Sequence, residues 1–151
     1  MHYDRLEDNL LLKSLVLGPE PEADDERSAR ENERLAGQQP IVRLVENLLQ
    51  DAARRRASDI HVRPREDDFE VLFRIDGGLV AVRSFAKPLL RAVTSRIKVM
   101  ASMDISKHRV PQDGRIPLAF GNTTIDVRVS VLPSVYGESC VLRLLNPQDG
   151  L

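Results

Sequence analysis

Two arginines, Arg128 and Arg143, are the residues whose type and spacing best suit the binding of an anion. They lie in segment 124–145, where apolar residues alternate with polar ones in two runs, the pattern of half-buried strands. Pro133 and Gly137 lie between the two runs and are typical of a turn. The segment therefore predicts an antiparallel hairpin whose loop is longer than a tight turn.

The register of this hairpin follows from burial, because a slip of one residue would turn a whole apolar face toward solvent. Pairing Val131 with Cys140 sets apolar residues against apolar residues along both strands. The same register places Arg128 opposite Arg143, and like charges in that position destabilise a sheet. The two arginines therefore need a neutralising partner.

Two explanations for this pair of like charges are open. One is a nearby acid, such as Asp126 or Glu138. The other is a bound anion, most naturally a phosphate, because the planar guanidinium group binds phosphate oxygens with two parallel hydrogen bonds.

The composition of the chain excludes several classes of protein. The chain has 151 residues and a net charge of −1, from 22 basic and 23 acidic residues, which argues against a globally basic nucleic-acid binder. A single cysteine excludes an intramolecular disulfide and suits a reducing cytoplasm. No apolar run approaches the roughly 20 residues that cross a bilayer, and the N-terminus lacks the pattern of a signal peptide.

Hydrophobic periodicity predicts a helix, three strands, a second helix and three more strands. The predicted helices cover 40–56 and 86–103, and the predicted strands cover 58–64, 69–75, 79–82, 116–120 and the two arms of the 124–145 hairpin. This order indicates an α+β domain, with a mainly antiparallel sheet of about six strands and two main helices packed on it.

The periodicity also assigns sides to individual residues. On the second helix, Ser95 and Lys98 are expected to lie mostly away from the core. On the first strand, Asp59 and His61 are expected to face outward. Cys140 alternates into the apolar face, so a buried and inert thiol is expected there.

Residues 1–37 are predicted to lie outside the folded domain. Residues 1–17 contain leucines at helical spacing and could dock on the domain's own core or on a partner. Residues 18–37 are highly charged and contain few large apolar residues, so they are interpreted as a flexible linker, with helix after Asp24.

No established catalytic motif occurs in the sequence. There is no GxxxxGK[ST] phosphate loop, no GxSxG, no HExxH and no GxGxxG. The histidines, His2, His61 and His108, share no metal-ligand spacing, so no metal site is expected. A weak nucleic-acid binder would use the exposed basic residues Arg54–Arg56, Arg91, Arg96 and Lys98, and it is the least favoured of three hypotheses.

Five motifs in order carry a resemblance to a known family. They are PIVRLVENLLQDAARRRASDIHVRP (40–64), RIDG (74–77), SRIKVMASMDI (95–105), PQDGRI (111–116) and DVRVSVLPSVYGESCVLRLL (126–145). Together they resemble the N-terminal domain of type II secretion and type IV pilus assembly ATPases, the GspE/PilB type. Each motif alone is weak, and the five in sequence are a strong signal.

The resemblance implies a PAS-like domain over 38–147, with 148–151 beginning a linker to a RecA-like motor domain. The parent enzymes are cytoplasmic hexamers at the bacterial inner membrane, with platform proteins as partners and with ATP and Mg as cofactors. Arg128 in DVRVS and Arg143 in VLRLL match the family's arginines that reach the nucleotide phosphates, and Arg115 in PQDGR is a weaker candidate.

Some residues depart from the family pattern. Arg63 stands where the family usually has an acid after SDIH, and Ser106-Lys107-His108 replaces a typical acidic residue after DI. The salt bridges that those acids make in relatives are therefore not expected here.

The leading hypothesis is a regulatory and assembly domain that supplies arginines to the phosphates and couples hydrolysis to hexamer motion. The chain itself, lacking a phosphate loop, is not expected to be an enzyme or to bind nucleic acid. It is interpreted as a fragment, or as a natural stand-alone member. The alternative function is a stand-alone PAS-like interaction or sensor module without catalysis.

Overall fold

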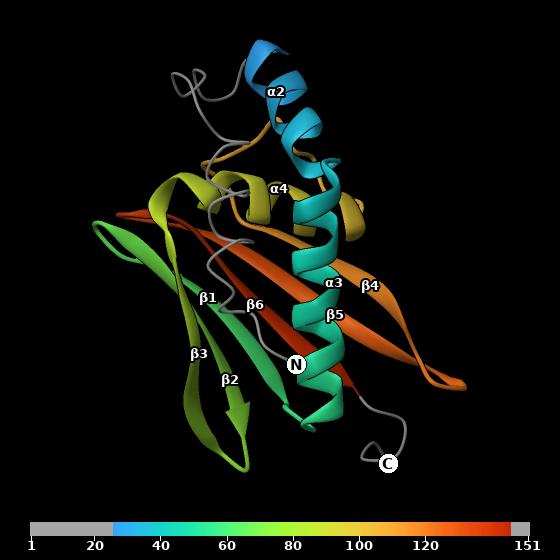
Figure 1. The fold of residues 1–151 in the computed structure, drawn as a ribbon. Helices are drawn as coiled ribbons and strands as arrows, with labels where there is room; N and C mark the ends of the chain where they lie inside the picture. The colour runs from blue at the N-terminus through green and yellow to red at the C-terminus, as the bar shows by residue number, and fades with distance from the viewer. Residues whose placement is uncertain (1–25, 146–151) are drawn as a thin grey trace.

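The alternation of apolar and polar residues gives six antiparallel strands in one sheet, as the computed structural model of residues 26–145 shows (Figure 1). The strands are β1 (Asp59–Pro64), β2 (Asp68–Ile75), β3 (Gly78–Ala86), β4 (Gln112–Phe120), β5 (Thr123–Ser134) and β6 (Gly137–Leu145). Their order in the sheet is β3-β2-β1-β6-β5-β4. Two three-stranded meanders, β1–β3 and β4–β6, are therefore joined through the pairing of β1 with β6.

Helices cover one face of this sheet (Figure 1). The helical elements are α2 (Glu26–Ala36), α3 (Gln39–Arg54), the 3-10 turn η1 (Lys87–Leu89) and α4 (Leu90–Met100). Helix α3 has a proline in its first turn, where the missing N–H leaves no hydrogen bond unmade. Its apolar stripe is buried against the sheet together with that of α4. Many polar side chains, including the arginines of β4, β5 and β6, lie on the other face. An antiparallel six-stranded sheet with helices on one face confirms the predicted α+β fold.

The predicted hairpin register is confirmed. Val131 pairs with Cys140 and Arg128 pairs with Arg143 across β5 and β6. The Cys140 side chain is buried, and burial raises the pKa of its thiol to about 12, which makes it inert.

The second helix is shorter than predicted, and its buried side is wider. Helix α4 ends at Met100 instead of residue 103, and Ser102 adopts a positive φ of 59° just after it. Ser95 and Lys98 are 3% and 1% exposed, so the expectation that they lie away from the core is wrong. The physical reason is that α4 packs on three sides, against the sheet, α3 and α2.

Helix α2 supplies this extra packing. A helix was expected after Asp24, but inside a flexible linker; instead, Leu35 and Ala36 are buried. The amide of Asn32, which is also buried, donates to the backbone carbonyl of Ile105 at 3.5 Å. Part of the charged segment is therefore packed onto the domain. The expected helix at 1–17 and the linker at 148–151 lie outside the described residues.

Candidate functional site

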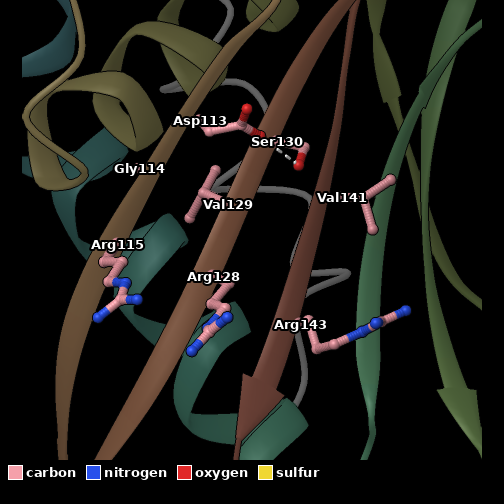
Figure 2. Close-up of a pocket in the computed structure, with 8 residues that line it drawn as sticks. All are labelled: Asp113, Gly114, Arg115, Arg128, Val129, Ser130, Val141 and Arg143. Atoms are coloured by element: carbon pink, nitrogen blue, oxygen red, sulfur yellow. Dashed lines mark hydrogen bonds between the residues drawn. The ribbon is translucent and has the colours of Figure 1, made fainter.

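The arginine row consists of Arg115, Arg128 and Arg143, which lie on three neighbouring strands. Arg115 on β4 pairs in register with Arg128 on β5, and Arg128 pairs with Arg143 on β6. All three alternate with core residues, so their side chains extend from the face of the sheet opposite the helices, which lie behind the strands in Figure 2. The structure thus brings together all three arginines that the sequence analysis selected.

These residues line a shallow groove with a volume of about 590 Å³, here called the arginine groove. It is lined by Asp113, Gly114, Arg115, Arg128, Val129, Ser130, Val141 and Arg143 (Figure 2). At one end the Ser130 hydroxyl donates to the Asp113 carboxylate at 2.8 Å. Three guanidinium groups and a single carboxylate give the groove a positive charge, which favours an anionic ligand.

Only glycine fits at position 114, because the end of α4 lies directly against this part of β4. A Cβ atom at this position would lie 2.5 Å from the backbone oxygen of Ala101 and 3.0 Å from the Ala101 Cβ. The glycine therefore lets β4 lie close to the end of the helix, and this contact fixes the edge strand that carries Arg115.

Among the residues that the structure describes, the acidic partner of Arg128 is Asp126, and the contact is loose. The Nε of Arg128 lies 3.9 Å from an Asp126 oxygen, and both side chains are largely exposed. Glu138, the other acid that the sequence suggested, instead forms an ion pair with Lys98 at 2.8 Å and does not neutralise the arginines. An exposed ion pair such as that of Arg128 with Asp126 contributes little to stability, so Arg128 stays available for an anion.

Arg143 points toward β1, away from the guanidinium group of Arg128 (Figure 2). Its Nε donates to the Asp59 carboxylate at 3.1 Å. The two arginines are therefore neighbours in register, as expected, but their guanidinium groups diverge. The neutralising acid is one that the sequence analysis did not select.

Asp59 faces outward as predicted, but it is only 5% exposed. Its carboxylate also accepts a hydrogen bond from the Ser58 hydroxyl at 3.0 Å and lies 3.6 Å from Arg74 Nε. Strand alternation could indicate its side of the sheet. It could not indicate that β1 lies beside β6, which is what brings Asp59 to Arg143.

The basic residues of the nucleic-acid hypothesis do not act as one exposed surface. Lys98 is buried. Arg54 and Arg55 form ion pairs with Asp51 at 3.5 Å and 3.8 Å, at the end of α3. The arginine groove is therefore the better candidate for anion binding.

Residues 26–145 contain neither a metal-ligand cluster nor a helix that could span a membrane. Within that range no group of three or more His, Cys, Asp or Glu side chains could hold a metal ion. The helices of the same range include none with the length and hydropathy of a membrane span.

Comparison with known proteins gives the family. The sequence profile described as Type II/IV secretion system protein matches residues 34–150. The chain belongs to this family.

Family members with high identity include both pilus and secretion proteins. The chain is 50% identical over 117 residues to the type IV pilus assembly ATPase PilB of Myxococcus xanthus, covering 77% of this chain and 21% of that protein. It is 50% identical over 107 residues to the putative type II secretion system protein E of Escherichia coli, covering 71% and 22%. It is 48% identical over 111 residues to the type II secretion system protein HxcR of Pseudomonas aeruginosa, covering 74% and 24%. The matched region is thus about a fifth to a quarter of each relative.

Proposed function

We propose that this domain supplies Arg128 and Arg143, with Arg115 beside them, to the phosphate groups of a nucleotide bound by a RecA-like motor domain. The observation that carries the proposal is the arginine row, which sets three guanidinium groups on neighbouring strands at an open groove. The family relationship and the name of the pilus assembly ATPase among the relatives support a nucleotide as the anion.

The chemistry follows from where charge develops. A bound ATP with Mg supplies the phosphoryl group that is transferred to water. Negative charge spreads over the phosphate oxygens as the bond to the leaving group lengthens, and fixed cations stabilise that charge. Arg128 and Arg143 orient and neutralise these oxygens, and they do so only when the domain lies against the motor domain. Hydrolysis is thereby coupled to movement of the domain within a hexamer.

We also propose that the domain acts in a cytoplasmic hexameric ATPase, peripheral to the bacterial inner membrane. Its partners there are the neighbouring subunits and the secretion or pilus platform proteins. The alternative, a stand-alone interaction or sensor module, stays a hypothesis without an observation that favours it.

The test uses this sequence joined to its motor domain. We expect Arg128→Ala and Arg143→Ala each to lower the ATPase rate by about 100-fold, because each removes a charge that stabilises the transition state. Arg54→Ala is the matched control, since Arg54 lies on α3 and pairs only with Asp51 among the described ion pairs. Wild-type turnover from both groove variants, in folded protein, would overturn the proposal.

A further inference from the structure

Asp59 continues the arginine row across the centre of the sheet. It pairs in register with Arg143 of β6 on one side and with Arg74 of β2 on the other. Its two carboxylate oxygens lie 3.1 Å from the Nε of Arg143 and 3.6 Å from the Nε of Arg74. One carboxylate is therefore shared between an arginine that lines the groove and an arginine that does not.

The burial of these groups is unequal. The Asp59 side chain is 7% exposed, whereas that of Arg143 is 66% exposed. A buried carboxylate is costly to leave without a partner, while an exposed guanidinium leaves an ion pair at little cost. If Arg143 moves away, Asp59 still has Arg74 and the hydroxyl of Ser58.

Arg74 is itself held in place. Its Nη1 donates to the backbone carbonyl of Gly77 at 2.9 Å, in the turn between β2 and β3. Arg74 thus stays beside Asp59 whatever Arg143 does, because its second contact belongs to its own hairpin.

We propose that Asp59 is a positioning residue: it holds the guanidinium group of Arg143 toward β1, away from that of Arg128, until a phosphate group takes the place of the Asp59 carboxylate. Arg74 is the counter-ion that keeps Asp59 paired after this exchange. The proposal rests on the proposed phosphate-binding role of Arg143. Carboxylate and phosphate oxygens compete for the same guanidinium group, so one charge-assisted hydrogen bond is exchanged for another. In the domain without phosphate, Asp59 also keeps the guanidinium group of Arg143 apart from the like charge of Arg128.

The first test titrates the 151-residue chain with inorganic tripolyphosphate at low salt and follows the arginine Nε–H signals by NMR. We expect the signals of Arg128 and Arg143 to move together, while that of Arg74 stays close to its starting position. A shift at Arg128 with no change at Arg143 would overturn the exchange. This measurement needs no variant, so it holds even if a substitution at Asp59 unfolds the domain.

The second test compares two variants that lose the same charge. Asp59→Asn should tighten tripolyphosphate binding by about fivefold, since it removes the competing ion pair. Asp126→Asn is the matched control, because Asp126 contacts Arg128 only at 3.9 Å and is exposed. The gain in tripolyphosphate affinity from Asp126→Asn should be clearly smaller than the gain from Asp59→Asn.

A double-variant cycle separates competition from a general effect of charge. In an Arg143→Gln background the gain from Asp59→Asn should disappear, because the competing partner is gone. Arg74→Gln should weaken tripolyphosphate binding, because Asp59 without Arg74 holds Arg143 more strongly. This loss should be smaller in the Asp59→Asn background, where the carboxylate is absent. Equal gains from both aspartate variants, or a gain that survives in Arg143→Gln, would overturn the positioning role and leave the phosphate role standing. No response of Arg143 to tripolyphosphate would overturn the exchange, whereas the phosphate role is decided separately by the ATPase rates of Arg128→Ala and Arg143→Ala in the protein joined to its motor domain.

Discussion

Lys98 of α4 and Glu138 of β6 form an ion pair at 2.8 Å in which the lysine is almost completely buried. The ammonium group of Lys98 also donates to the backbone carbonyl of Lys107 at 2.7 Å. His108 lies 3.7 Å from the same carboxylate, and the His108 ring is 3.4 Å from the amide of Asn32 in α2. One buried polar cluster therefore links α4, β6, the connection before β4, and α2.

This ion pair predicts a large loss of stability when one partner is removed. Lys98→Met should lower the free energy of unfolding by about 3 kcal/mol, because it leaves Glu138 charged and nearly buried. Lys107→Met, at an exposed side chain, is the control and should change stability little. The double variant Lys98→Met/Glu138→Gln should recover part of the loss. Urea unfolding measures all four proteins, and a Lys98→Met variant as stable as the control would contradict the prediction.

The close approach of β4 to α4 predicts the effect of a single methyl group. Gly114→Ala should destabilise the domain by about 1–3 kcal/mol, because the new Cβ meets backbone that cannot rotate away. Gly78→Ala is the matched control, since its nearest atom lies 3.8 Å from the added Cβ. Chemical denaturation of the two variants measures this difference. Equal unfolding midpoints would show that β4 can shift away from α4 without a loss of stability.

The half-buried His61 predicts a dependence of stability on pH. Burial lowers the pKa of His61 from its ordinary value of 6.5; Arg74 and Arg63 act in the same direction, and Asp59 opposes them. Between the lowered folded pKa and 6.5, the unfolded chain binds more protons at this residue than the folded chain does. The contribution of His61 to stability is therefore full above pH 6.5 and decreases as the pH falls through this window.

The measurement is the urea midpoint at pH 7.5 and at pH 5.5, for the wild type and for His61→Leu. The wild type should lose more stability on acidification than the variant does, because the carboxylates and the other two histidines titrate in both proteins and only the wild type has His61. An identical loss in both proteins would assign the pH dependence to other groups.

Much of the fold could be predicted because its signals are local. Alternation along the chain fixed the sides of the strands, and burial fixed the register of Arg128 against Arg143. The turn at Asp76-Gly77, where both residues have positive φ, follows from the residue types alone. The resemblance to the family added the same pair of arginines from a separate line of reasoning.

The features that the sequence analysis missed depend on contacts distant in sequence. Asp59 meets Arg143 only because β1 and β6 are neighbours, although 84 residues separate them. Lys98 is buried only because α2 and β6 cover a side of α4 that its own periodicity marks as polar. Neither relationship is present in any local window, so hydrophobic pattern could not reveal it.

The order of the strands has a consequence for how the chain folds. Each half of the sheet is a meander of consecutive strands, so its pairings close over short loops and form early. The pairing of β1 with β6 joins two strands that are far apart in sequence, and it requires β6, the last of these six strands to be synthesised. Asp59 and Arg143 lie on opposite sides of that pairing, so the carboxylate and the arginine that it holds come into contact only when the two halves of the sheet join.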